Sequence, residues 1–151
     1  MKPFIVLLSV FALSLVSARI LRGNFECAWS ARAAMSVMLM FTAVAHFIFT
    51  EGMAMMLPDF IPRKTEIVYL TGAIEIAAAI GLLIPGLRVV TAWLLILFFI
   101  LILPANICAT IKNVDYQKAT LDGNGLSYLW FRIPLQGLYI VWTYLSSIRN
   151  H

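Results

Sequence analysis

Five polar residues lie inside stretches of sequence that are otherwise apolar enough to cross a lipid bilayer. They are His46, Glu75, Asn106, Arg132 and Gln136. An ionisable group within a membrane span is costly, so it usually faces the protein interior, finds a partner and marks a functional site. Arg, His and Gln supply hydrogen-bond donors, which the carbonyl groups of a quinone accept. These residue types indicate a ligand-binding pocket better than a catalytic centre. Trp130, beside Arg132, is the one tryptophan that we expect to touch a ligand.

The same five residues are predicted to share one depth in the membrane. If consecutive helices alternate in direction, each residue can be placed relative to the mixed-charge end of the helices, formed by residues 51–66 and 112–125. With a rise of about 1.5 Å per residue, all five fall roughly 6 to 15 Å from that end. Within this layer Glu75 and Arg132 are the natural ion pair, because a guanidinium offers a planar fork of donors to a carboxylate.

Two prolines beside this layer favour a cavity rather than a closely packed interface between the helices. Pro134 lies between Arg132 and Gln136, and Pro104 lies two residues before Asn106. A proline cannot donate to the carbonyl four residues earlier, so each leaves an acceptor free in the hydrocarbon region. A purely structural alternative stays open, in which the ion pair and its amide neighbours only lock four helices in register.

Several other chemistries do not fit the sequence. A metal site needs three or four suitable ligands, and His46 with Glu75 falls short of that number. Haem ligation lacks a second histidine within a span, because His151 is terminal. The basic residues are scattered singly, which argues against nucleic-acid binding, and no phosphate loop or serine-hydrolase motif is present. The pattern establishes no cofactor, although it is compatible with a quinone.

The composition indicates an integral membrane protein of one domain. Hydrophobic residues make up 62% of the 151 residues and charged residues 12%, against roughly half and a quarter in soluble proteins. Each spanning helix needs about 20 apolar residues. Five apolar segments are predicted, at Pro3–Ala18, Ala28–Thr50, Ile67–Ile84, Leu87–Ile111 and Leu126–Ser147. The expected fold is an all-α membrane protein, in which residues 28–151 form an antiparallel four-helix transmembrane bundle.

The leading segment, residues 1–22, allows two interpretations. Lys2, the apolar run and the small residues Val16, Ser17 and Ala18 are typical of a cleaved signal peptide. Basic residues just past an apolar run, here at positions 19 and 22, instead favour an uncleaved extra helix. We favour the extra helix, and both alternatives remain open.

From about Arg32 to its end, the chain resembles the DoxX-like family of small integral membrane proteins. The resemblance rests on Ala45-His46-Phe47, Met56-Leu57-Pro58, Ile61-Pro62, Tyr69-Leu70-Thr71-Gly72-Ala73-Ile74-Glu75, Leu82-Leu83-Ile84-Pro85, Leu103-Pro104-Ala105-Asn106 and Phe131-Arg132-Ile133-Pro134-Leu135-Gln136. It implies a four-helix bundle, in most cases in the bacterial inner membrane. Some members look like partners of respiratory-type oxidoreductases, others like assembly chaperones, and no catalytic residue is carried over.

Three hypotheses of function follow. The first is an accessory subunit of a membrane oxidoreductase, not itself a stand-alone enzyme, with an intramembrane pocket for a quinone or another lipophilic ligand. The second is a structural or chaperone-like protein that guides a partner membrane protein. The third is a small proton-coupled transporter that uses Glu75, although an ion pair with Arg132 would oppose cycles of protonation.

Overall fold

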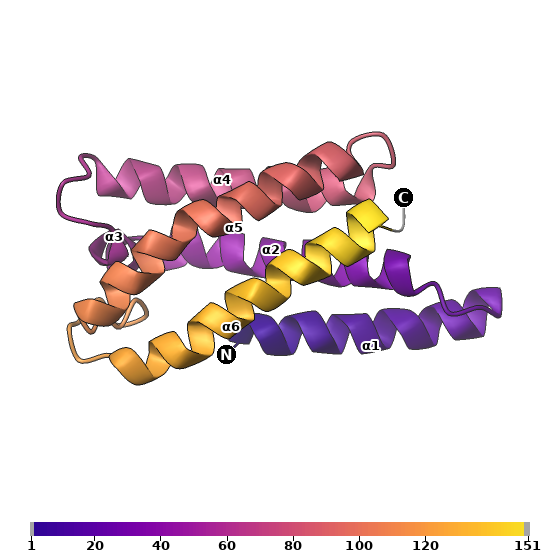
Figure 1. Ribbon diagram of the computed structural model, residues 1–151, viewed down its shortest axis with the longest axis horizontal. Helices are drawn as coiled ribbons and strands as arrows, with labels where there is room; N and C mark the ends of the chain where they lie inside the picture. The colour runs from indigo at the N-terminus through magenta and orange to yellow at the C-terminus, as the bar shows by residue number, and fades with distance from the viewer. Residues whose placement is uncertain (1, 150–151) are drawn as a thin grey trace.

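The computed structural model describes residues 2–149, and these residues form helices and no β-strand (Figure 1). The elements are α1 (Lys2–Arg22), α2 (Cys27–Ile48), α3 (Thr50–Met56), α4 (Lys64–Leu83), α5 (Arg88–Ile111), α6 (Leu126–Thr143) and the π-helical turn η1 (Tyr144–Arg149). The prediction of an all-helical chain is therefore confirmed. Helices α5 and α6 both continue through their internal prolines, Pro104 and Pro134.

Four of the described helices, α1, α2, α4 and α5, are long and apolar enough to cross a membrane. The segment Leu126–Ser147 is predicted to be a fifth such helix, but α6 is not among those that meet this criterion. The physical reason is local, because Arg132 and Gln136 interrupt its apolar sequence and the π-helical turn begins at Tyr144. Helix α6, which carries two of the five candidate polar residues, is therefore less apolar by this criterion than the other four long helices.

Helix α2 lies at the centre of the packing. It packs against α4 and α1, while α5 packs against α6. Figure 1 shows that α1 starts part-way along the other helices and extends past them where α2 begins. The buried core joins α2, α4, α5 and α6 and includes one residue of α1; its members are Leu7, Ala34, Met35, Met38, Leu39, Ala78, Ala79, Leu82, Ala92, Leu95, Phe99, Leu135 and Tyr139.

A short helix and a loop cover the mixed-charge end. The sequence predicts a loop over residues 51–66, but its first part forms α3, because Phe49 leaves helical geometry and a new helix starts at Thr50. The loop between α5 and α6 packs on α3 at Gly52, where an added Cβ would collide with the backbone carbonyl of Tyr116. The rings of Phe49 and Tyr116 also meet, with centroids 6.1 Å apart. Residues far apart in sequence therefore close this end together.

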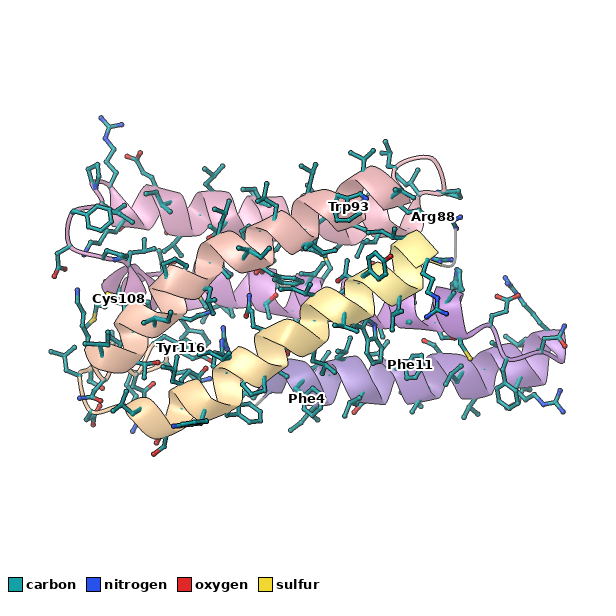
Figure 2. All side chains as sticks on the ribbon, viewed as in Figure 1. Phe4, Phe11, Arg88, Trp93, Cys108 and Tyr116 are labelled. Atoms are coloured by element: carbon teal, nitrogen blue, oxygen red, sulfur yellow. The ribbon has the colours of Figure 1, made fainter. Side chains whose placement is uncertain are left out.

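The opposite end of the molecule carries Arg88 and Trp93, whereas Tyr116 and Cys108 lie at the covered end (Figure 2). Between the two ends, the outer faces of the helices carry exposed apolar side chains. On α5 alone these include Val90, Trp93, Leu94, Leu97, Ile100 and Leu101. A soluble protein of this size rarely exposes so continuous an apolar surface.

Candidate functional site

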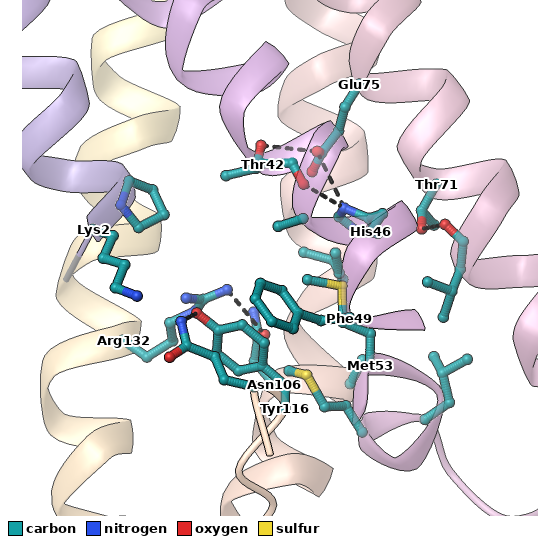
Figure 3. Close-up of a pocket in the computed structure, with 18 of the residues that line it drawn as sticks. Lys2, Thr42, His46, Phe49, Met53, Thr71, Glu75, Asn106, Tyr116 and Arg132 are labelled. Atoms are coloured by element: carbon teal, nitrogen blue, oxygen red, sulfur yellow. Dashed lines mark hydrogen bonds and ion pairs between the residues drawn. The ribbon is translucent and has the colours of Figure 1, made fainter. Parts of the chain in front are cut away.

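A cavity of about 200 Å³ lies at the covered end, between α2, α4, α5 and α6 (Figure 3). The first residues of α1, helix α3 and the loop before α6 complete its lining. Four of the predicted site residues contribute to the lining, namely His46, Glu75, Asn106 and Arg132. The structure therefore brings together one candidate residue from each of the four helices that the sequence singled out.

One wall of the cavity is an acid, an imidazole and a hydroxyl, which we call the Glu75 cluster (Glu75, Thr42 and His46). Thr42 Oγ1 donates to Glu75 Oε2 at 2.8 Å, and His46 Nδ1 lies 3.5 Å from the same oxygen. His46 Nδ1 is also 2.9 Å from the carbonyl oxygen of Thr42. Because a carbonyl can only accept, this contact assigns a proton to Nδ1. Glu75 and His46 are 5% and 7% exposed, so the cluster is buried. Glu75 contacts both of the other members.

Close packing of two helices builds this cluster. Thr42 and His46 are one turn apart and share a face of α2, and α4 packs against that helix. Gly72 permits the approach, since a Cβ there would lie 3.0 Å from His46 Cβ and 3.2 Å from the ring of Phe47. Such contacts are tighter than most side chains make, so a glycine at this position brings α4 against the imidazole.

The facing wall, the Arg132 cluster, consists of Arg132, Asn106 and Tyr128. Arg132 donates to the Tyr128 hydroxyl at 3.0 Å and, weakly, to Asn106 Oδ1 at 3.4 Å. Its guanidinium carbon lies 5.8 Å from the centroid of the Tyr128 ring. Two donors on this wall, Asn106 Nδ2 and Arg132 Nε, are buried and have no hydrogen-bond partner. The Arg132 cluster is therefore incomplete, unlike the Glu75 cluster.

The predicted ion pair between Glu75 and Arg132 does not form, and that prediction was wrong. Among residues 2–149, the ion-pair contact of Glu75 is His46, and no carboxylate lies within contact of Arg132. The two residues share a cavity but stand on different walls of it. They are kept apart because α4 packs against α2, whereas α6 packs against α5.

Two other candidates lie away from the cavity lining. Gln136 is buried, and its Nε2 donates to the carbonyl of Phe99 at 2.7 Å, which joins α6 to α5. Phe99 directly precedes Ile100, whose carbonyl lacks its usual helical donor because Pro104 has no N–H. Trp130 is 83% exposed and points away from the core. The structure thus gives Gln136 a completed hydrogen bond between helices and places Trp130 on the surface.

Sequence reasoning missed Thr42 and Tyr128, which are partners of site residues. Each precedes a predicted residue by four positions, so each faces the same way on its helix: Thr42 with His46 and Tyr128 with Arg132. That spacing was available in the sequence. The position of Lys2 beside the cavity could not be predicted from the sequence, because no local pattern indicates where the start of α1 will lie.

Ion pairs at the surface hold the covered end together. Asp59, after α3, accepts from Lys112 at 2.7 Å and from Lys64 at 3.0 Å, which links the ends of α4 and α5. These hydrogen bonds lower the pKa of Asp59 to about 2, and the bond that Lys112 donates to Asp59 raises the pKa of Lys112. Burial raises the pKa of Tyr116, so its phenol stays neutral where it lines the cavity. Within the described part of the chain, no three His, Cys, Asp or Glu side chains are grouped to hold a metal ion.

The chain is thus a small all-helical protein with long apolar helices and, near one end, a cavity that contains two clusters of polar residues. The chain belongs to the family described as a domain of unknown function, DUF8561, which matches residues 35–147. The match begins within α2 and ends within η1, so it contains both clusters and leaves α1 outside. No curated protein and no solved structure matches the chain.

Proposed function

We propose that this chain is an integral membrane protein of the DoxX-like type, in which α2, α4, α5 and α6 form an antiparallel transmembrane bundle and α1 is an additional helix. The long apolar helices and their exposed apolar faces support insertion into a bilayer, most simply a bacterial inner membrane. In this setting the cavity lies within the membrane and close to one surface. Its apolar lining and few polar groups are typical of a ligand site.

Within that membrane protein, the cavity binds a lipophilic small molecule that has a hydrogen-bond-accepting head group, such as a quinone. The observation that carries this proposal is the pair of buried donors without partners, Asn106 Nδ2 and Arg132 Nε. A buried donor left unpaired costs about 1–3 kcal/mol, so a bound acceptor recovers that free energy. Arg132, which only donates, faces Oδ1 of Asn106, so the free group of this amide is Nδ2. As a ligand-binding accessory subunit, the protein would serve a membrane oxidoreductase rather than act alone.

Binding to purified protein tests this proposal directly. The protein is placed in lipid nanodiscs and titrated with decylbenzoquinone, and bound ligand is measured by equilibrium dialysis. Asn106→Leu removes the unpaired donor at similar size, and we expect affinity to fall by about fivefold, as for one hydrogen bond. Trp130→Phe is the matched control at an exposed position on α6 and should bind as the wild type does. An Asn106→Leu affinity equal to that of the wild type would contradict the proposal, and absence of saturable quinone binding would remove the quinone as the ligand.

A structural or assembly role is the second candidate, and completed hydrogen bonds between helices favour it. Gln136 bonds the carbonyl of Phe99, and Ser36 bonds the carbonyl of Ala79 at 2.7 Å. Cross-linking in native membranes separates the two functions. A stable protein partner whose capture survives Asn106→Leu and does not depend on small ligands would favour the assembly role.

A further inference from the structure

The charged and amide groups of the Arg132 cluster offer hydrogen-bond donors but no free acceptor. An arginine has five N–H donors and no acceptor, and it stays protonated in proteins. The amide oxygen of Asn106 already faces Arg132, so its remaining group is the unpaired Nδ2. A ligand seated here must therefore bring the acceptors itself.

A second cation points into the same space. Lys2 lines the cavity, and Figure 3 shows its side chain directed toward that of Arg132 from the start of α1. Neither cation forms an ion pair with a carboxylate of the described residues. Two like charges that converge repel each other, and an anion that lies between them is attracted by both.

The nearest acid does not supply that negative charge by contact. The carboxyl group of Glu75 faces Thr42 and His46 on the other wall, and its short contacts are to these two residues. The remaining titratable groups that line the cavity are the phenols of Tyr116 and Tyr128 and the imidazole of His46, none of which is an anionic partner of Arg132. The cavity thus has positive charge on one wall that its own residues leave unmatched.

We infer that the ligand of this cavity is an amphiphilic anion, whose oxyanion head group binds between Arg132, Asn106 Nδ2 and Lys2. The inference rests on the proposed function and narrows its ligand class from any lipophilic acceptor to a charged one. A planar carboxylate matches the fork of the guanidinium. The volume of about 200 Å³ suits a head group and the first part of one chain rather than a whole phospholipid. The apolar part of the ligand lies against Phe41, Phe49, Met53 and Ile102, which line the same cavity.

The test compares two amphiphiles of equal chain length on the full chain in nanodiscs. Dodecanoate carries the charged head group, and dodecan-1-ol carries a neutral one. We expect the wild type to bind dodecanoate roughly tenfold or more tightly than dodecanol, as for hydrogen bonds to a charged group. Arg132→Gln should abolish this preference, Arg132→Lys should keep part of it, and Lys2→Gln should reduce it less than Arg132→Gln.

Arg88→Gln is the matched control, because it removes an arginine from the opposite end of the molecule and should leave the preference unchanged (Figure 2). Thermal unfolding of each variant verifies that it is folded. Equal binding of the two amphiphiles by the wild type, or a preference that survives Arg132→Gln, would overturn the inference. If decylbenzoquinone binds in a manner that depends on Asn106 while dodecanoate does not bind, the anion is wrong and the cavity function stands. If no probe binds saturably, both are wrong.

Discussion

The two walls of the cavity contain similar numbers of polar groups, yet only one wall is complete. In the Glu75 cluster the hydroxyl of Thr42 donates to the carboxyl group of Glu75 across the contact between α2 and α4, and the imidazole of His46 lies against the same carboxyl oxygen and the carbonyl of Thr42. In the Arg132 cluster, whose residues line the cavity, two buried donors have no partner. A completed cluster stabilises the folded state, whereas an incomplete one is costly until something binds. The difference predicts that mutations in the two walls will separate stability from binding.

The largest expected effect is on the cover that both walls share. Gly52→Ala places a Cβ against the carbonyl of Tyr116, and backbone cannot move aside as a side chain can. We expect a loss of about 1–3 kcal/mol in the free energy of unfolding, the usual cost of overpacking. Gly137→Ala is the control, because nothing lies within 4 Å of its added Cβ, and alanine favours the helix. Denaturation in detergent measures both variants, and equal stabilities would show that the loop does not pack on α3.

The Glu75 cluster should lose stability when its hydroxyl is removed. Thr42→Val keeps the shape of the side chain but deletes the donor to Glu75 Oε2. We expect the free energy of unfolding to fall by about 1–2 kcal/mol, because a buried carboxyl group loses its partner. Adding Glu75→Leu to this variant should recover much of the loss, as apolar replacement of buried polar groups often does. A Thr42→Val protein as stable as the wild type would end the claim that this wall is structural.

The Arg132 cluster should respond in the opposite way. Asn106→Leu removes an amide whose Nδ2 is unpaired, so we expect the free energy of unfolding to change by less than about 1 kcal/mol or to increase. Binding should weaken in the same variant, which is the trade-off expected where function requires unsatisfied groups. Thermal unfolding without and with ligand measures both quantities. A large loss of stability without ligand would place Asn106 among the structural residues and remove the contrast between the walls.

The sequence was a better guide to which residues lie near one another than to how these residues pair. Apolar length and helix direction were enough to place His46, Glu75 and Asn106 near one cavity, because depth depends only on the rise per residue. Pairing depends on which helices are neighbours, and α4 beside α2 gave Glu75 a histidine rather than Arg132. Because Glu75 contacts His46 and not Arg132, no ion pair with Arg132 opposes cycles of protonation at Glu75, and proton-coupled transport is no longer disfavoured on that ground.

Other features depended on long-range packing that no local pattern encodes. The segment after Phe49 has no proline before position 58, so its first residues were free to form α3. Its role as a cover becomes visible only through the loop that packs on Gly52. Likewise, α1 was predicted as a helix, but its offset along α2, which brings Lys2 to the cavity, is a tertiary property.

The smallest expected effect concerns the ion pairs outside the cavity, where solvent screens each charge. The pKa of Asp59 is about 2 in the folded protein, below its ordinary value of 3.8. A lowered carboxyl pKa contributes stability that is present above the ordinary pKa and is lost as pH falls toward the folded one. Apparent Tm should therefore fall slightly between about pH 4 and pH 2 in the wild type, and less in Asp59→Asn. Because Asp59 links the ends of α4 and α5 at the covered end, the same variant should also speed ligand exchange. Identical acid profiles in the two proteins would show that surface ion pairs do not hold the covered end, which would leave the packing of Tyr116 on Gly52 as its main support.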